Sequence, residues 1–163
     1  MPGWPPDERF RIIMDSATDY AFVILEPDNT IVGWSPGAEK ILGWSENEIL
    51  GQNGNLFFTP EDRAKGEAEL EKEIASRTGR AEDERWHLRK DGTRFWGSGV
   101  MARIEDAERP GFVKIMRDLT ARVLAQQNQE RLARLERAAP AMHTAPHSCA
   151  ERELSLQSPA RLS

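Results

Sequence analysis

The clearest alternation of apolar and polar positions lies between Glu84 and Ile104, where two runs flank Asp91-Gly92. This pattern predicts a β-hairpin, because the tight turn needs positive φ angles that Asp and Gly adopt at low cost. Successive side chains of a strand point to opposite faces. In the first strand the two sets are Trp86 and Leu88 against Arg85, His87 and Arg89; in the second they are Trp96, Val100, Ala102 and Ile104 against Phe95, Gly97, Gly99 and Met101.

Both faces of the second strand carry apolar side chains, so the pattern does not settle which face is buried. Gly97 and Gly99 share one of these faces. Glycine inside a strand marks either a local defect or space for something that lies on the sheet, and we favour the defect. We expect His87 to be a surface or partner-contacting residue, because it lies on the face opposite Trp86 and Leu88.

The N-terminal part of the chain predicts one helix and two strands. Asp7 can cap the helix, and Tyr20–Leu25 is typical of a buried strand. A turn at residues 27–29 leads into a second strand at residues 30–34. The helix has apolar residues at helical spacing, namely Phe10, Ile13, Met14 and Ala17.

Two short helices and one long helix precede the hairpin. Ser35 caps the first short helix and Gly43 ends it, while Ser45 and Glu48 form a capping box for the second. Residues 59–76 predict one longer helix on the outside of the sheet, because nearly all its residues are charged. A polar loop at 105–111 and a last strand at 112–119 follow the hairpin.

Residues 120–139 change the pattern to a helix with a short coiled-coil seam. The seam residues recur at alternating spacings of four and three, and all but Asn128 are apolar: Ala121, Ala125, Asn128, Leu132, Leu135 and Ala139. The alternative is a solvated helix with chance spacing. Residues 140–163 have no periodicity and are predicted to be disordered. The expected organisation is a tail at 1–6, a domain at 7–120, the helix at 121–139 and a tail at 140–163.

Composition excludes several classes of function for a chain of 163 residues. A net charge of −5 argues against binding to nucleic acid or to an anionic membrane. Cys149 is the single cysteine, so no intrachain disulfide is possible. The longest apolar run, Tyr20–Leu25, is too short to cross a bilayer, and no secretory segment opens the chain. We therefore expect a cytoplasmic protein.

The order of elements predicts an α+β fold: a five-stranded antiparallel sheet with short helices on one face, an N-terminal cap helix and a C-terminal exit helix. At this point the chain resembles PAS domains of the bacterial sensory-box type. The resemblance covers residues 7–120 and rests on several short motifs in order. These are residues 33–39, 42–44, 49–51, 58–63, Arg89-Lys90-Asp91-Gly92-Thr93 and residues 111–120.

The resemblance implies a sensory or interaction module without catalytic activity, and it assigns roles to residues. Asp118 and Thr120 of the closing Asp-x-Thr motif are expected to pass a change in the sheet to the exit helix. The chain is expected to form a homodimer through the PAS domain and the exit helix, and the seam of that helix is Ala125, Leu132 and Leu135. The candidate pocket for an unidentified small ligand is Phe22, Trp34, Ile41, Asn53, Leu56, Phe57, Trp86, Phe95 and Ile115. The competing interpretation is that these residues are simply the core, and we favour it for most of them.

No catalytic, metal or cofactor site is expected. PAS domains that form a cysteine adduct with flavin contain a motif similar to Gly-x-Asn-Cys. Here Gly54 stands at the cysteine position, which excludes the adduct. Asn53 matches the motif, so only a noncovalent flavin stays open. Haem-binding PAS domains use a His on the long helix, and residues 59–78 contain none. His143, His147 and Cys149 have metal-ligand chemistry but lie in the polar tail without a fourth ligand.

The predicted function is a signal-transduction module of a two-component pathway that relays ligand or partner binding to a dimerising helix. Two alternatives remain open. One is a dimerisation module without a ligand, and the other is a detached sensory part of a histidine kinase, because nothing after residue 140 resembles a nucleotide-binding domain. A histidine kinase or another signalling protein is the expected partner, with no nucleic acid and no membrane.

Overall fold

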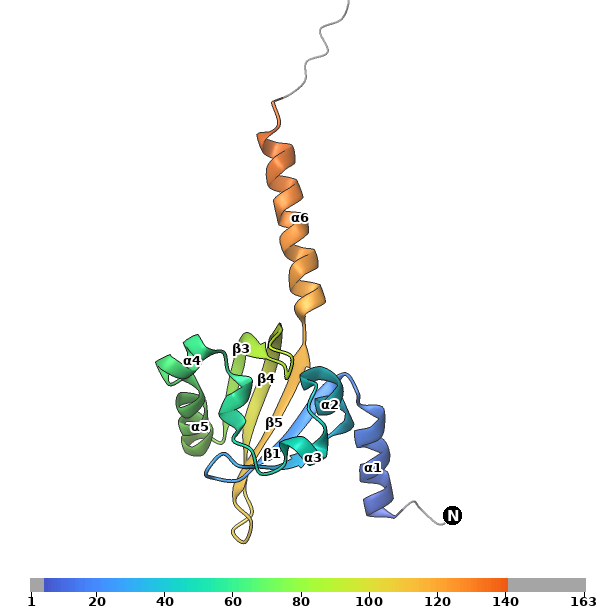
Figure 1. Cartoon of the computed structure of the whole chain (residues 1–163), viewed down its shortest axis with the longest axis vertical. Helices are drawn as coiled ribbons and strands as arrows, with labels where there is room; N and C mark the ends of the chain where they lie inside the picture. Colours follow the sequence, from blue (N-terminus) through green and yellow to red (C-terminus); the bar gives the residue numbers. More distant parts are fainter. Residues whose placement is uncertain (1–4, 141–163) are drawn as a thin grey trace, which may run out of the picture. The chain divides into compact units, whose positions relative to one another are not determined.

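The computed structural model describes residues 5–140, which form one five-stranded antiparallel sheet with helices on one face (Figure 1). The strand order is β2-β1-β5-β4-β3, so the first and last parts of the domain meet in the middle of the sheet. The expected fold class is therefore confirmed. The strands are β1 (Tyr20–Leu25), β2 (Ile31–Trp34), β3 (Arg80–Leu88), β4 (Arg94–Ile104) and β5 (Gly111–Asp118).

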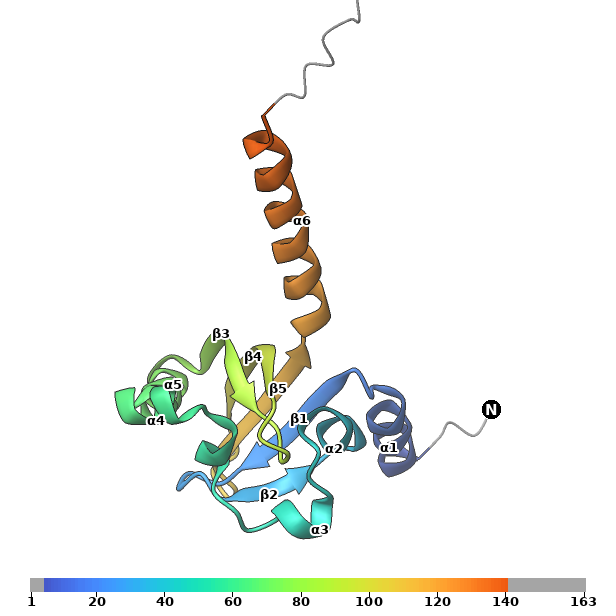
Figure 2. The same cartoon turned by 45° about the horizontal axis from the view of Figure 1, so that its top comes forward.

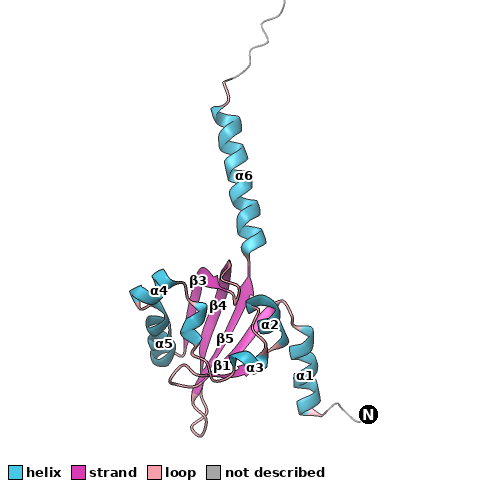
Figure 3. Ribbon diagram, in the orientation of Figure 1, coloured by secondary structure: helices cyan, strands magenta, loops and turns pink. Residues whose placement is uncertain are grey.

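Short helices between β2 and β3 cover one face of the sheet, as two views show (Figures 2 and 3). We call this covered face the inner face and the opposite one the outer face. The helices are α2 (Pro36–Leu42), α3 (Glu46–Ile49), the 3₁₀ turn η1 (Gly54–Phe57), α4 (Pro60–Lys65) and α5 (Glu67–Thr78). α1 (Pro6–Ser16) packs beside α2, and α6 (Thr120–Ala138) begins two residues after β5.

The predicted hairpin is present, with Trp86 paired directly opposite Trp96. Their rings meet edge to face with centroids 5.4 Å apart, a favoured aromatic geometry. Gly92 has φ of +81°, the turn conformation that glycine adopts without strain. The hairpin therefore forms through local turn chemistry and is then stabilised by this cross-strand pair.

The inner face of the hairpin is the one with His87, which corrects the expectation that His87 lies at the surface. His87 is fully buried, and Asp83 and Phe95 are buried with it. Trp86 and Trp96 lie on the outer face and are half-buried. The reason is that the charged residues of β3 find partners under the helices, which outweighs the general preference for apolar inner residues.

Gly97 and Gly99 provide space on the sheet, and the chain's own side chains occupy that space. A Cβ at Gly97 would lie 2.5 Å from Cδ2 of His87, and one at Gly99 would lie 2.8 Å from Oδ1 of Asp83. The favoured interpretation of a strand defect was therefore wrong. The two glycines let a buried imidazole and a buried carboxylate lie flat against β4.

Two helix predictions also need correction. Asp7 is in the first turn of α1 but does not cap it, since Pro5 is the cap residue and α1 has no buried residue. The expected long helix is two helices, because Gly66 adopts a left-handed φ of +76° between α4 and α5. That break turns α5 so that Glu71 and Ala75 face the sheet and are buried.

Gly97→Ala tests whether the space at Gly97 is required by His87. The added methyl group must push the imidazole or bend the strand, so we expect a loss of about 1–3 kcal/mol in the free energy of unfolding. Urea unfolding followed by tryptophan fluorescence measures it. Ser98→Ala is the control, because Ser98 is the next residue and lies on the outer face. An unchanged urea midpoint for Gly97→Ala would contradict this account.

Candidate functional site

A buried ion network joins α5 to the sheet under the helices. Lys114 lies in the middle of β5 with 1% of its surface exposed. Its Nζ donates to both carboxylate oxygens of Glu71 at 2.7 Å and lies 3.3 Å from Oδ2 of Asp83. A lysine this deeply buried needs such partners, because removing an ammonium group from water costs several kcal/mol. Lys114 therefore fixes the position of α5 on the inner face.

Arg85 and His87 extend this network along β3. Arg85 pairs with Glu67 at 3.2 Å and with Asp62 at 3.5 Å, so it links β3 to α5 and α4. Nε of Arg85 and Nε2 of His87 each lie 3.3 Å from Oδ2 of Asp83, at ion-pair distance but without hydrogen-bond alignment. We call Asp62, Glu67, Glu71, Asp83, Arg85, His87 and Lys114 the interior network.

Asp83 is the common acceptor of the interior network, and its environment determines its charge. Burial by itself raises the pKa of a carboxyl group, but His87, Lys114 and Arg85 around Asp83 outweigh burial and lower the pKa of Asp83. Asp83 is therefore a stable anion at neutral pH. Its Oδ1 is buried without a hydrogen-bond partner in the part of the chain that the structure describes.

An aromatic ring closes the network on the helical side. Nζ of Lys114 lies 4.8 Å from the ring centroid of Phe58, and Cζ of Arg85 lies 5.7 Å from it. The ring of His87 meets Phe58 edge to face at 5.5 Å. The backbone of Phe58 also forms an isolated antiparallel bridge with His87. The segment after η1 therefore covers the charges and excludes water from them.

A second polar cluster connects the inner face to the start of α6. Asp118 accepts two hydrogen bonds from Thr120 through Oδ1, at 2.9 Å from the backbone N and 2.6 Å from Oγ1. Oγ1 of Thr120 in turn accepts a hydrogen bond of 2.9 Å from the backbone N of Trp96. Burial raises the pKa of Asp118, but the bonds from Thr120 and Arg89 outweigh it, so the pKa is lowered.

Arg89 links this exit cluster to the core. It donates to the carbonyl oxygen of Ile41 and, at 2.7 Å, to Oδ2 of Asp118. Its guanidinium lies 4.6 Å from the ring centroid of Phe95, which itself packs against His87 with ring centroids 5.6 Å apart. Contacts therefore run without a gap from the interior network through Phe95 and Arg89 to Asp118.

The candidate pocket residues divide between the two faces of the sheet. Trp34, Ile41, Leu56, Phe57 and Phe95 belong to or pack on the core of the inner face. Phe22, Trp86 and Ile115 lie on the outer face, because they alternate with the buried residues of their strands. Asn53 is exposed and caps η1 through a hydrogen bond from the backbone N of Asn55. The predicted set is therefore not one site.

Sequence reasoning missed the interior network and Arg89. Two signals in the sequence point to the interior network. Asp83, Arg85 and His87 occupy every second position of β3 and so share one face, and Lys114 lies within an apolar strand. A charged residue at such positions is either exposed or paired, and only the packing of α5 shows that these are paired.

The predicted seam residues of α6 are exposed, with Leu132 54% and Leu135 59% accessible to solvent. Ala125 is exposed as well. The seam remains a prediction. His143, His147 and Cys149 lie outside the described residues.

The inner face has neither the cysteine nor the helical histidine that the resemblance associates with a covalent flavin or a haem. Gly54 has no sulfur and faces Leu25 and Asn29 closely, and residues 5–140 contain no cysteine. α4 and α5 contain no histidine, and the inward position of α5 is Glu71, which is bound to Lys114. The space beneath α5 is thus occupied by the chain's own charged side chains.

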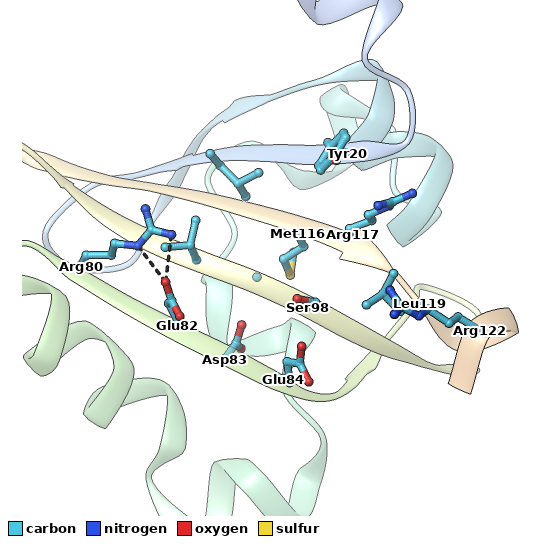
Figure 4. A pocket seen from close by; sticks show the side chains of 13 residues that line it. Tyr20, Arg80, Glu82, Asp83, Glu84, Ser98, Met116, Arg117, Leu119 and Arg122 are labelled. Carbon is cyan, nitrogen blue, oxygen red and sulfur yellow. Dashed lines mark hydrogen bonds and ion pairs between the residues drawn. The ribbon is translucent and has the colours of Figure 1, made fainter. Parts of the chain in front are cut away.

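The outer face carries a shallow groove of mixed charge (Figure 4). Glu82 and Glu84 of β3 line one side, and Arg117 of β5 and Arg122 of α6 line the other. Tyr20 stacks under Arg117 with 5.6 Å between Cζ and the ring centroid.

Among the described residues, no helix has the length and apolarity needed to cross a membrane.

Lys114→Met tests whether the interior network holds α5 on the sheet. The variant leaves Glu71 and Asp83 without their cation, so we expect a loss of roughly 3–5 kcal/mol in unfolding free energy. The double variant Lys114→Met/Glu71→Met removes cation and anion together and is expected to lose less than the single variant. Urea unfolding measures both.

The matched control for that measurement is Lys90→Met, which breaks the half-exposed pair with Glu48. We expect a change of no more than about 1 kcal/mol, as for other exposed pairs. Equal losses for Lys114→Met and Lys90→Met would show that the buried pair has no special role.

Comparison with known proteins agrees with this architecture. A family model described as a PAS domain matches residues 19–121. Two-component system protein A of Emericella nidulans is 36% identical over 121 residues, which are 74% of this chain and 18% of that protein. Sensor protein FixL of Bradyrhizobium diazoefficiens is 29% identical over 140 residues, 80% of this chain and 26% of that protein.

A solved structure shows the same fold. The PAS domain of a protein from Colwellia psychrerythraea has a TM-score of 0.62 at 24% identity, and the match covers 69% of this chain and 97% of that one. The chain spans only a small part of the length of the two relatives named above. With the family model matching well over half of its residues, the chain belongs to the PAS domain family and carries a sensory domain related to those of two-component signalling proteins.

Proposed function

We propose that this PAS domain senses a condition in its interior and relays it to α6, which pairs with a second copy of the chain. The domain itself catalyses no reaction in this proposal and acts on a histidine kinase or another signalling protein. Relatives named as a two-component system protein and a sensor protein support the pathway. We also propose a cytoplasmic location, which suits a domain of that kind.

The observation that carries the relay is the chain of contacts from Phe95 through Arg89 and Asp118 to Thr120. Thr120 is the first residue of α6, and its Oγ1 bonds both the end of β5 and the start of β4. A shift of β3 or β4 therefore changes the hydrogen bonds at the first turn of α6. Such a set of linked contacts couples two sites if both bias the same arrangement.

A second candidate is a dimerisation module without a small-molecule ligand. The interior network favours it, because charged side chains of the chain itself occupy the inner face beneath α5. Native mass spectrometry of the purified chain distinguishes the two. A small molecule that stays bound to the folded chain supports a ligand sensor, and a bare chain mass supports a module that responds to something else.

The relay predicts that a change in the interior alters α6 only while Thr120 keeps its hydroxyl group. Glu71→Gln keeps the shape of the side chain and removes its charge, so we expect it to shift the amide resonances of residues 121–127. In a Thr120→Val background these shifts should vanish, because the hydroxyl group that bonds Asp118 and accepts from Trp96 is gone and only the backbone bond to Asp118 remains. Two-dimensional ¹H–¹⁵N NMR measures them.

Thr120→Ser is the control for that experiment, since serine keeps the hydroxyl group. The α6 shifts caused by Glu71→Gln are expected to persist in the Thr120→Ser background. If they persist equally in the Thr120→Val background, the signal does not pass through Thr120.

The dimer proposal predicts that Leu132→Glu/Leu135→Glu separates the copies. Two carboxylates in an apolar seam repel across the interface, so the mass in light scattering should fall to that of one chain, 18.4 kDa. Gln126→Glu/Gln127→Glu adds the same charge on the side of the helix away from the seam and should leave the dimer intact. A leucine variant that keeps the wild-type mass would rule out this seam as the interface.

A further inference from the structure

Both ring nitrogens of His87 face hydrogen-bond acceptors. Nδ1 lies 3.3 Å from the carbonyl oxygen of Phe57, and Nε2 lies 3.3 Å from Oδ2 of Asp83. A neutral imidazole has one N–H, so it can satisfy only one of these acceptors, whereas an imidazolium has two. The ring is fully buried, so water does not replace the missing donor.

The interior network holds more negative than positive groups around His87. Lys114 has Glu71 as its closest partner and also reaches Asp83, and Arg85 is shared among Glu67, Asp83 and Asp62. The charged groups around His87 come from β3, β5, α4 and α5, and they comprise four carboxylates and two cations besides His87 itself: Asp62, Glu67, Glu71, Asp83, Arg85 and Lys114. These groups leave an excess of two negative charges, which a positive charge on His87 reduces to one.

The ring of His87 has little freedom to turn away. Phe58 packs against one edge at 5.5 Å, and Phe95 packs against the ring at 5.6 Å between centroids. Gly97 supports it from the sheet, with so little space that a single Cβ there would lie 2.5 Å from Cδ2. A change in the charge of His87 must therefore be accommodated by the groups around it.

We propose that the stimulus of this domain is the proton and that His87 is its binding site, an inference that rests on the proposed sensory function. Histidine is the side chain whose charge ordinarily changes between pH 5 and 8. Bound between Asp83 and the carbonyl group of Phe57, the imidazolium holds η1 against β3. The site takes a proton from solvent water and returns it there, and no other reactant is needed.

Loss of the proton has a defined consequence at η1. Nε2 keeps its hydrogen, because it lies at ion-pair distance from the Asp83 carboxylate, whose full charge attracts a proton more strongly than a carbonyl dipole does. Nδ1 then presents a lone pair to the carbonyl oxygen of Phe57, and the two repel each other at 3.3 Å. Since the ring is held by Phe58, Phe95 and Gly97, the relief comes from η1, which moves away from β3.

The test follows His87 and η1 together in the full chain. Imidazole ¹⁵N NMR between pH 5 and 9 should show two protonated nitrogens at low pH and only Nε2 protonated at high pH. Over the same range, amide exchange of Phe57 and Phe58, corrected for its intrinsic pH dependence, should rise roughly tenfold, the ratio for one lost hydrogen bond. The wild-type titration stands by itself even where a variant fails to fold.

Two variants sharpen the assignment. Asp83→Asn keeps an acceptor oxygen and removes the charge, so His87 should lose its proton at lower pH than in the wild-type chain. His143→Gln/His147→Gln removes the other two histidines of the chain and should leave the transition unchanged.

Each outcome of these measurements decides between the ideas. A His87 ring that keeps one protonation state from pH 5 to 9, or that titrates without any change at η1, overturns the proton site. In that case the Glu71→Gln experiment still tests the relay separately. A titration that changes η1 but not the amides of residues 121–127 supports the proton site and contradicts the relay to α6.

Discussion

The structure depends on the ion pair between Lys114 and Glu71, which joins the middle strand of the sheet to α5. Both side chains are almost fully buried, so either charge without its partner would strongly destabilise the folded state. Their two short hydrogen bonds compensate for the lost hydration and fix α5 in one position. Because α5 is fixed, Glu67 reaches Arg85, and Phe58 covers the charges. The rest of the interior follows from this one pair.

This pair also determines what the domain can hold. In a PAS fold the space between the sheet and the helices is where a ligand would lie, and here that space beneath α5 contains charged side chains of the chain itself. Gly97 and Gly99 show that the sheet is adapted to them, since each glycine admits one polar side chain of β3. The domain is therefore built around an internal set of charges, and a small change such as one proton alters their balance.

The hydrogen bonds between the end of β5 and the start of α6 are connected to the charged interior through Arg89. Arg89 lies directly after β3, contacts the ring of Phe95 and donates a hydrogen bond to Asp118. It therefore connects the interior network to the polar cluster at the start of α6. Asp118 and Thr120 then anchor the first turn of α6 to β4 and β5.

Local pattern in the sequence determined the elements of this protein. The turn at Asp91-Gly92, the caps at Ser35 and Ser45, and the alternation in β3 each depend on neighbours along the chain, and these predictions agree with the structure. The strand Tyr20–Leu25 was predicted to be buried, but only one of its faces is, since Tyr20 and Ile24 are exposed. Asp118 and Thr120 were assigned from a short motif, and the structure places them together. Only tertiary structure decided which face of the hairpin is buried, because that depends on Lys114, which lies 31 residues after Asp83 and 43 after Glu71 in the chain and meets both through packing. A charged residue is expected outside unless a partner from another element compensates for its lost hydration, and a pattern along one strand contains no such partner.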